Sequence, residues 1–473
     1  MFKLIVLITL LIPQFSFAGY RDASLIFGHG TRGNVNKFGR MVVHLVEAGN
    51  YYASIPLIKE YMTSTGGANL TPELDMALDE IILNVGVRQF ELLPVEILSR
   101  SNSPSVNYIL AKKFFRIGKY KKALKYIRGM NDKHSMAPFA RLLEGSAYSI
   151  LGLQRKSIDM FKRCIAVTDD SLGQTSDKLQ VRQLLVTKDE CLIGIARAHF
   201  AAKRYERSNL TYLDLPKSSF VWPDILFEEA WNSYYRKNYN RTLGKLVTYS
   251  APVLDHIFNP EIHILEALSY MELCLYGDAK KVVDSFYKRY LKRNQRIAKF
   301  IKSNGRDYNF YYKLGRLATK GPIKGNRLLN RFMKSIVHGA TYNDLIESLM
   351  TGRHEFSELK KLKRTPFNTF LLKNTLDSLK VQKKLVGSYV RRRLVVTHLQ
   401  VKKAFQQMSY IKLEVLARRK ADLFRYTEEP GERKRGDVKF ISRNEKQYFW
   451  TFNGEFWVDE LGDYVFALGN ECR

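Results

Sequence analysis

Three groups of residues have types and spacings that could carry chemistry. The run Gly28–Gly33 (GHGTRG) has the glycines of a phosphate-binding loop. Glu347 and Ser348 place a carboxylate beside a hydroxyl on a predicted helix. Near the C-terminus the chain gathers four acids, Glu455, Asp459, Glu460 and Asp463. These groups suggest phosphate binding, proton transfer and metal binding, so each must be compared with the partners that its chemistry requires.

The glycine run and the acids lack those partners. The run does not have the GxxxxGK[ST] spacing and follows no buried strand, so a phosphate loop is not expected there. The four acids lie in a strongly basic protein, and we expect them to pair with Lys and Arg of a long helix. A metal site or a catalytic carboxylate pair is the alternative reading of these acids. No CxxC or Cys/His cluster is present that would indicate zinc.

The Glu347–Ser348 pair resembles the acid motif of lytic transglycosylases, some of which carry a helical superstructure. The Gly-rich, Met-Gln segment that follows this motif in the family is missing here. The HExxH, GxSxG and Walker patterns are absent as well. We therefore predict that the chain is not an enzyme and needs no cofactor, with a peptidoglycan-lytic enzyme as a minor alternative.

The N-terminus predicts export. Lys3 precedes the apolar stretch Leu4–Ile12, and Ser16-Phe17-Ala18 forms a small-x-small cleavage site. The apolar stretch is short for a bilayer span, which needs roughly 20 residues; an uncleaved anchor helix is the alternative. We expect a signal peptide over 1–18, cleaved after Ala18, and a periplasmic bacterial protein. The Gly-rich residues 19–34 predict a flexible arm.

The formal net charge of +31 on 473 residues indicates which kinds of partner the protein would attract. In an exported protein, the acidic surfaces that such a charge would meet are envelope polymers, anionic lipid headgroups or an acidic protein, and nucleic acid is not expected. Solvated helix faces are the simpler explanation for much of this charge.

A repeat of helix pairs organises the larger part of the chain. Pro104 and Pro138 lie 34 residues apart, and the same size classes recur at this offset. In the second copy the repeated positions are Gly145 and Tyr148 on the first helix, Gly152 at the turn, and Ser157 and Phe161 on the second helix. Small residues at such positions let paired helices approach closely.

This pattern resembles the tetratricopeptide repeat (TPR). Asn107 and Arg141 depart from it, because the family often has Trp there. About seven units over 35–293, clearest at 104–171 and interrupted by a polar insertion at 169–188, would form a right-handed solenoid. The resemblance implies a protein or peptide partner in a concave groove. In this register the exposed first-helix residues are Lys112, Arg116, Ser146, Ser149 and Arg197.

Four cysteines fit an exported protein and allow three pairings. Cys164 ends one repeat and Cys191 begins the next, and stacking brings such positions together. We predict a Cys164–Cys191 disulfide, which leaves Cys274 and Cys472 as the second pair. Free buried thiols are the alternative for that second pair.

After the repeats the pattern changes to a basic region over 294–427. Its main element is one helix over about 368–426, whose apolar residues follow coiled-coil-like spacings of three and four. We favour packing within the chain over dimerisation of this helix, and its oligomeric state stays open. A charged linker follows at 428–445.

The aromatic tail over 446–473 predicts a β-hairpin. Aromatic runs flank Asn453-Gly454, a strong turn signal. We expect this hairpin to dock on the basic face of the long helix. The tail also resembles the ends of repeat-containing envelope proteins of gliding and predatory δ-proteobacterial-type bacteria.

Taken together, the sequence predicts an all-α protein with a TPR-like solenoid, long coiled-coil-like helices and a small C-terminal β-hairpin. Its expected function is a periplasmic scaffold that binds a protein partner in an envelope complex, with a role in motility as one possibility. The alternative is a binder of anionic envelope polymer or membrane surface, acting through the basic region 289–444.

Overall fold

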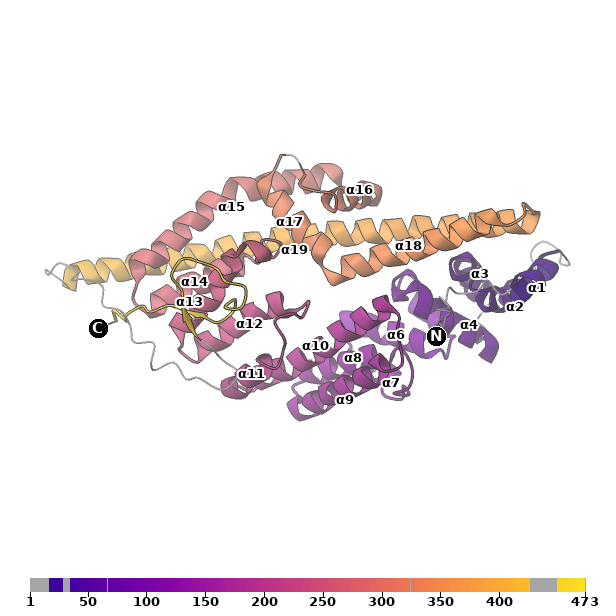
Figure 1. Cartoon of the computed structure of the whole chain (residues 1–473), viewed down its shortest axis with the longest axis horizontal. Coiled ribbons are helices and arrows are strands. Elements are labelled where there is room, and N and C mark those ends of the chain that lie inside the picture. The colour runs from indigo at the N-terminus through magenta and orange to yellow at the C-terminus, as the bar shows by residue number, and fades with distance from the viewer. Residues whose placement is uncertain (1–16, 29–34, 66, 324, 426–448, 473) are drawn as a thin grey trace, which may run out of the picture. The chain divides into compact units, whose positions relative to one another are not determined.

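The computed structural model describes residues 17–28, 35–65, 67–323, 325–425 and 449–472, with the side chains of Phe17 and of residues 419–425 left aside. The predicted signal peptide before Phe17 and the linker at 428–445 lie outside this part. The described residues form an all-α fold with one very small sheet (Figure 1). None of the described helices is both long and apolar enough to cross a membrane.

The chain divides into two compact units. Unit 1 comprises residues up to 136 together with 345–385, and unit 2 comprises 137–344 together with 386–473. The sequence did not predict this division, because the repeat pattern continues through residue 136 without a change in period. Two helices have residues in both units, α18 (Ala340–Lys361) and α19 (Pro366–Arg425).

Unit 1 contains the first helix pairs. Its elements before residue 136 are α1 (Phe17–Gly28), α2 (Val35–Glu47), α3 (Tyr51–Ser64), α4 (Pro72–Val85), η1 (Val87–Gln89), α5 (Val95–Leu98), α6 (Pro104–Arg116) and α7 (Tyr120–Ile127). Helix α2 packs on its partner α3 and on α4, which in turn packs on α6. This contact pattern is that of stacked repeats, in which each pair completes the core of the next.

Of the residues expected to form a flexible arm, 19–28 belong to helix α1, and 29–34 lie outside the described residues. This part of the prediction is wrong because Tyr20 and Phe27 find aromatic partners far along the chain. Tyr20 packs on Phe367 with ring centroids 5.2 Å apart, and Phe27 packs on Phe370 at 5.1 Å. Gly19 lets α1 approach α2 closely, since a Cβ there would lie 2.5 Å from the carbonyl oxygen of His44.

Unit 2 continues the helix pairs. Its elements are α8 (Ala137–Ile150), α9 (Gln154–Leu172), α10 (Lys178–Ala201), α11 (Tyr205–Tyr212), α12 (Trp222–Tyr235), α13 (Tyr239–Val247), η2 (Thr248–Ser250), η3 (Pro252–Leu254), α14 (Glu261–Glu272), α15 (Tyr276–Asn304), α16 (Tyr308–Ala318), α17 (Arg327–His338), β1 (Trp450–Thr451) and β2 (Tyr464–Val465). The insertion predicted at 169–188 is mostly helical, because it lengthens α9 and α10.

The aromatic ring of Phe161 fixes the spacing of three helices in unit 2. A Cβ on Gly145 of α8 would lie 2.6 Å from this ring, and a Cβ on Gly194 of α10 would lie 2.5 Å from it. The ring on α9 therefore fits only because both neighbouring helices present glycine. Gly145 and Phe161 are positions that the repeat pattern identified, whereas Gly194 became apparent only from the structure.

The C-terminal segment contains a β element, but it is not the predicted hairpin. Strand β1 pairs with β2 in parallel, with Trp450 opposite Tyr464 and Thr451 opposite Val465. The second aromatic run, at Phe456 and Trp457, forms no strand. Gly454 lies in a bend with φ of 104°, and the chain then continues to Tyr464 before it pairs. The Asn453-Gly454 signal therefore did not produce the predicted hairpin.

This segment docks on α13 rather than on α19. Asn240 of α13 exchanges two hydrogen bonds with the backbone of Leu468, of 3.0 and 3.1 Å. Asp463 pairs with Lys217 at 2.8 Å, which replaces the predicted pairing with the long helix. The buried Lys245 pairs with Glu229 at 2.5 Å and lies 3.3 Å from the carbonyl oxygen of Gly462. Hydrogen bonds to backbone groups thus hold a segment that has little regular structure.

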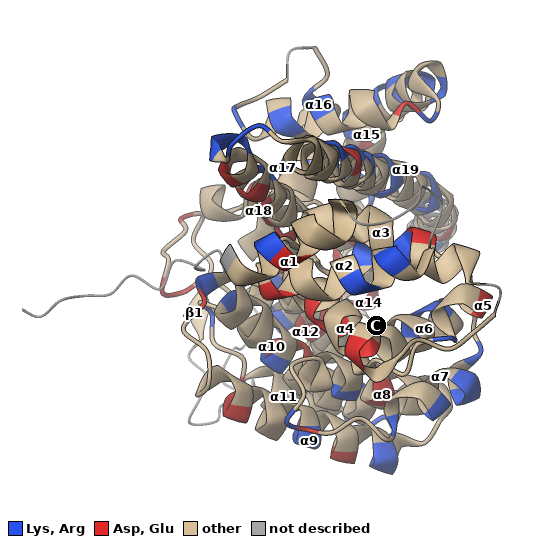
Figure 2. Cartoon of the chain, turned by 90° about the vertical axis from the view of Figure 1, so that its right-hand side faces the viewer, with Lys and Arg blue, Asp and Glu red and all other residues tan. Residues whose placement is uncertain are grey.

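Many Lys and Arg residues lie on helices, with Asp and Glu among them (Figure 2). Solvated helix faces as the explanation of much of the charge stay a prediction.

Substitution of Gly244 by Ala is expected to loosen the C-terminal segment. A Cβ at this position would lie 1.8 Å from the carbonyl oxygen of Tyr464, so either α13 or β2 must move. We expect faster amide hydrogen exchange over 464–468 in Gly244→Ala and a loss of roughly 1–3 kcal/mol of stability, as for other overpacked sites. Gly277→Ala is the matched control, since nothing lies within 4 Å of a Cβ there. Equal exchange in both variants would contradict this packing.

The buried Glu355 of α18 predicts a pH dependence of stability in unit 1. Its carboxylate accepts hydrogen bonds of 2.8 Å from the backbone N–H groups of Tyr52 and Ala53, at the start of α3. Burial raises the pKa of Glu355 from 4.5 to about 7, against the opposing effect of these hydrogen bonds. The folded state then binds more protons than the unfolded state between these pH values, so this group makes stability fall as pH rises through that window.

The variant Glu355→Gln isolates this effect. The wild type should lose free energy of unfolding relative to Glu355→Gln as pH increases from about 4.5 to 7, because only the wild type has a carboxyl that ionises in this window. Chemical denaturation at a series of pH values measures it. A difference that moves in favour of the wild type over this window would show that the ionised carboxylate is preferred.

Candidate functional site

The residues predicted to line a groove fall in both units. Lys112 and Arg116 on α6 belong to unit 1, and both pair with Glu91, at 2.9 and 2.8 Å. Burial lowers the pKa of Lys112, although the carboxylate of Glu91 opposes this. These two cations are therefore engaged within unit 1, and their role in binding a partner stays a prediction.

The other three predicted residues belong to unit 2. Ser146 donates a hydrogen bond of 2.8 Å to the carbonyl oxygen of Leu142 on its own helix, and Ser149 is half-buried. Arg197 on α10 is exposed and pairs with Glu228 of α12 at 2.7 Å. This ion pair joins the first helices of two successive repeats, which is where a groove residue is expected, and binding at Arg197 also stays a prediction.

The Glu347–Ser348 pair has a structural role at Ser348. Its hydroxyl donates a hydrogen bond of 2.8 Å to the carbonyl oxygen of Val85 at the end of α4. The hydroxyl of Tyr52 on α3 also contacts Ser348. These contacts hold α18 against α3 and α4 in unit 1. Within the described residues, no cluster of His, Cys, Asp and Glu could hold a metal ion.

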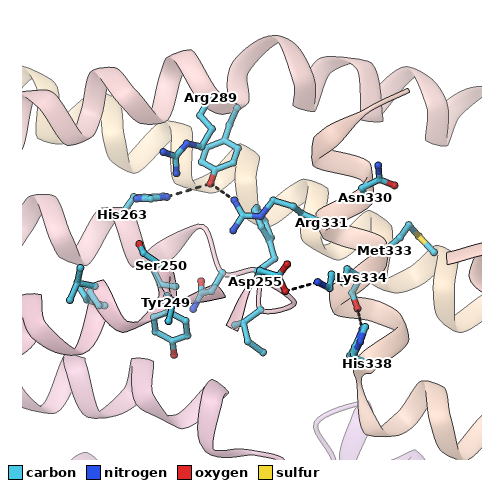
Figure 3. Close-up of a pocket in the computed structure, with 18 of the residues that line it drawn as sticks. Tyr249, Ser250, Asp255, His263, Arg289, Asn330, Arg331, Met333, Lys334 and His338 are labelled. Carbon is cyan, nitrogen blue, oxygen red and sulfur yellow. Dashed lines mark hydrogen bonds and ion pairs between the residues drawn. The ribbon is translucent and has the colours of Figure 1, made fainter. Parts of the chain in front are cut away.

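One candidate site is a cavity of about 850 Å³ in unit 2. The chain around it comes from the end of α13 through η2 and η3, and from α14, α15, α16 and α17 (Figure 3). Its apolar lining includes Tyr249, Phe258, Ile262, Met333 and Phe466. A volume of this size accommodates a small molecule or a few residues of a peptide.

The polar lining of the cavity contains more cations than anions. The cations are Arg289, Lys320, Arg331 and Lys334, and the anions are Asp255 and Glu266. Asp255 is already paired with Lys334 at 2.5 Å, and this hydrogen bond lowers the pKa of its carboxyl. The cavity consequently favours a ligand with negative charge and an apolar part.

Hydrogen bonds organise one wall of the cavity. The hydroxyl of the buried Tyr290 lies 3.4 Å from Nη1 of Arg331 and 3.4 Å from Nε2 of His263 (Figure 3). On the opposite side, Nδ1 of His338 donates a hydrogen bond of 2.8 Å to the backbone oxygen of Lys334. The rings of His338 and His256 pack with centroids 5.4 Å apart.

Sequence reasoning did not select this cavity. Its residues lie at the ends of several helices and in the two short 3-10 helices, so they share no period along the chain. The signal that was available is the aromatic and histidine content of 249–263 beside the basic residues of α15 and α17. That composition alone does not indicate a cavity.

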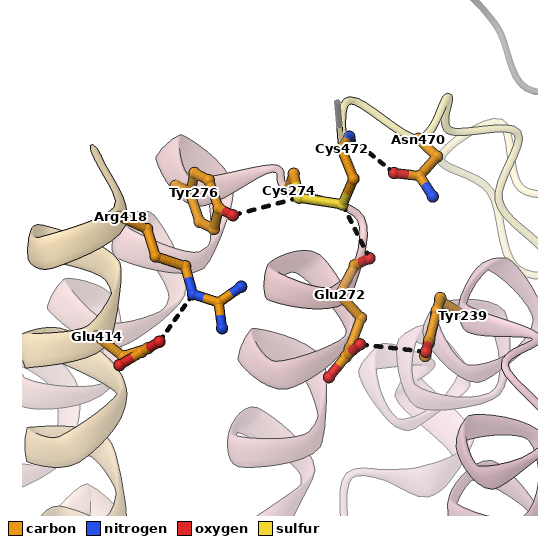
Figure 4. The surroundings of a disulfide bond; sticks show 8 residues. All are labelled: Tyr239, Glu272, Cys274, Tyr276, Glu414, Arg418, Asn470 and Cys472. Atoms are coloured by element: carbon orange, nitrogen blue, oxygen red, sulfur yellow. Dashed lines mark hydrogen bonds and ion pairs between the residues drawn. A yellow bond between two sulfur atoms is a disulfide. The ribbon is translucent and has the colours of Figure 1, made fainter. Parts of the chain in front are cut away.

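Both predicted disulfides are present, the one that the repeat register indicated and the one left for the remaining two cysteines. Cys164 of α9 is bonded to Cys191 of α10, with Cα atoms 6.2 Å apart. Cys274, just after α14, is bonded to Cys472, which fixes the C-terminal segment to the last repeat (Figure 4). The described part of the chain has no free cysteine. Two disulfides indicate an oxidising compartment, as in exported proteins.

Comparisons with known proteins give little further information. No protein-family model matches the sequence, and no curated protein matches it. Among solved structures, the chain is similar to a Rap protein complexed with competence and sporulation factor, with 12% identity over 76% of this chain and 99% of that chain and a TM-score of 0.31. A circular tandem repeat protein with novel repeat topology and enhanced subunit contact surfaces has 13% identity, over 80% of this chain and 78% of that chain, and a TM-score of 0.15.

Identities and TM-scores this low carry no argument about function. The helical-repeat fold of this chain therefore rests on its own packed helix pairs. The comparisons also give no support to the resemblance of the tail to envelope proteins of gliding bacteria.

The histidine pair beside the cavity predicts a loss of stability at acidic pH. Burial, together with the nearby His338, lowers the pKa of His256 below 6.5, while Asp255 has the opposite effect and Lys334 adds to the lowering. A lowered folded-state pKa favours the neutral ring, so this contribution is present above pH 6.5 and is lost as pH falls through the folded-state pKa. His256→Gln should make stability less sensitive to pH between about 5 and 7, measured by thermal unfolding. A pH dependence of the unfolding temperature that is the same in His256→Gln and in the wild type would contradict this role of His256.

Proposed function

We propose that the protein is a binding scaffold of an oxidising, exported compartment, and that unit 2 holds a segment of a protein partner in its cavity. The observation that carries this proposal is the cavity itself, which combines an apolar floor with an excess of cations on a helical-repeat framework. The fitting segment is short, contains an apolar side chain and carries a carboxylate.

Several features support binding in preference to catalysis. Both acidic groups of the lining are already paired, Asp255 with Lys334 and Glu266 with His263. The Glu-Ser pair contributes to helix packing in unit 1. Repeat proteins bind along surfaces that successive repeats build together, and the cavity receives residues from several consecutive elements.

The location proposed for this scaffold is the bacterial periplasm. The apolar segment that follows Lys3 and the small-x-small site ending at Ala18 support export. The two disulfides agree with an oxidising environment. The partner is accordingly sought among proteins of the cell envelope.

A crosslinking pull-down with cavity variants tests this proposal. Ser250 lines the cavity and is exposed, so Ser250→Trp should fill part of it without disturbing the core. We expect a partner captured by the wild type to be lost with Ser250→Trp and retained with Ser303→Trp, an exposed position on α15 outside the cavity. Binding of the purified partner then establishes that the contact is direct.

The variant Arg197→Ala separates the cavity from the groove predicted by the repeat register. Loss of the partner with Arg197→Ala and not with Ser250→Trp would move the binding site to that groove. Equal capture by all variants would contradict both sites. Circular dichroism and thermal unfolding of each variant verify that the fold is intact.

A further inference from the structure

A second, smaller hollow of unit 2 is lined almost entirely by arginine. Its volume is about 320 Å³, and its lining residues are Arg289, Tyr290, Arg293, Arg327, Leu328 and Arg331. It adjoins the larger cavity, since Arg289, Tyr290 and Arg331 line both. Its own character comes from the two arginines, Arg293 and Arg327, that belong to the smaller hollow alone.

Two packed helices place the four guanidinium groups together. Arg289 and Arg293 are four residues apart on α15, and Arg327 and Arg331 are four residues apart on α17. Residues at this spacing share one face of a helix, and α15 packs on α17. Asn326, which caps the N-terminus of α17 through hydrogen bonds from Leu328 and Leu329, also reaches toward the backbone oxygen of Arg293 at 3.5 Å.

These arginines have no acidic partners in the described part of the chain. Arg293 donates a hydrogen bond of 2.9 Å to the backbone oxygen of Arg289, and Arg331 has the long contact to the hydroxyl of Tyr290. Among the described residues, no Asp or Glu forms an ion pair with any of the four. Asp255, which lies near Arg331, is paired with Lys334.

Four like charges around one hollow repel one another, and a bound anion relieves that repulsion. Arg331 is half-buried and the other three are exposed, so ample N–H donors remain for a ligand. The positive end of the α17 dipole lies at the same place, because Arg327 is the first residue of that helix. The hollow therefore has the charge and the donors of an anion-binding site.

We propose that this hollow, formed by Arg289, Arg293, Arg327 and Arg331, binds the phosphoryl group of a phosphate-bearing ligand. Guanidinium groups match phosphate oxygens in bidentate geometry, and a phosphoryl group offers enough oxygens to engage several of them at once. One carboxylate has two oxygens and a single charge, which would leave most of these arginines without a counter-charge. The proposal does not depend on the protein partner of the larger cavity.

Titration of the purified mature protein with inorganic phosphate at constant ionic strength tests the site directly. We expect phosphate to raise the midpoint of thermal unfolding more than chloride does, because a ligand of the folded state stabilises it. The double variant Arg293→Gln/Arg327→Gln should weaken phosphate binding by roughly tenfold or more, as expected for the loss of charge-assisted hydrogen bonds. Both positions are exposed, so the variant should fold.

The variant Lys292→Gln is the matched control. It removes one positive charge from α15 at a position that does not line the hollow. Lys292→Gln should bind phosphate nearly as well as the wild type. An equal loss in this control would show diffuse attraction to a basic surface and would overturn the proposal. Absence of phosphate binding by the wild type, or equally strong binding of acetate, would overturn it as well.

The source of the phosphoryl group is distinguished by a second arm. Vesicles of phosphatidylglycerol are compared with vesicles of phosphatidylcholine, each with the wild type and the double arginine variant. Arginine-dependent binding to phosphatidylglycerol supports a lipid headgroup as the source. Arginine-dependent binding of free phosphate without vesicle binding supports a soluble or polymeric phosphate.

Discussion

The close approach of successive helices is the constraint on which the repeat packing of unit 2 depends. Phe161 on α9 lies against Gly145 of α8 and Gly194 of α10, and neither neighbour has room for a Cβ. A helix pair has no sufficient core of its own, so each must bury its apolar face against the next. The disulfide between Cys164 and Cys191 lies in the same hydrophobic cluster as Phe161 and joins α9 covalently to α10.

One departure from the TPR pattern shows how the packing tolerates substitution. Arg141, which stands where the family often has Trp, is almost completely buried in α8. Its guanidinium pairs with the equally buried Glu144, at 2.7 Å. A buried charge is tolerated only when it is paired and hydrogen-bonded. In the predicted repeat register, this ion pair stands at a position where an indole ring was expected.

The C-terminal segment packs on the repeats of unit 2. Here the segment of 449–472 covers α13, where Gly244 permits the backbone of Tyr464 to approach directly. The disulfide Cys274–Cys472 links residues 198 positions apart and holds the segment at the last repeat. It also restricts the conformations of the unfolded chain, which stabilises the folded state.

On α15 and α17, four arginines lie around one small hollow. Many Lys and Arg residues on the described helices are exposed, where single charges contribute little to a defined site. At α15 and α17, the four-residue spacing of arginines on two packed helices instead concentrates charge around one hollow. The larger cavity beside it has a mixed apolar and basic lining. Unit 2 therefore has two adjoining hollows with different linings, one mixed and one mainly of arginine.

The sequence by itself determined the local features of the protein. The period of 34 residues, with its glycines and small residues, predicted the helix pairs α6/α7 and α8/α9, because helix packing imposes size classes at fixed spacing. The same register brought Cys164 to Cys191 and left Cys274 for Cys472. The long helix was recognisable from its apolar spacing, and its observed bounds are Pro366–Arg425.

Only the tertiary structure decided which distant segments meet. The parallel pairing of Trp450 with Tyr464, the docking of the tail on α13 and the helix at Phe17–Gly28 all depend on partners remote in sequence. The cavity and the arginine hollow have the same origin, because their residues come from helix ends and from two separate helices. The spacing of apolar residues indicates which face of a helix is buried. The residues of a site between several helices follow no regular spacing along the sequence, so the sequence does not indicate the site.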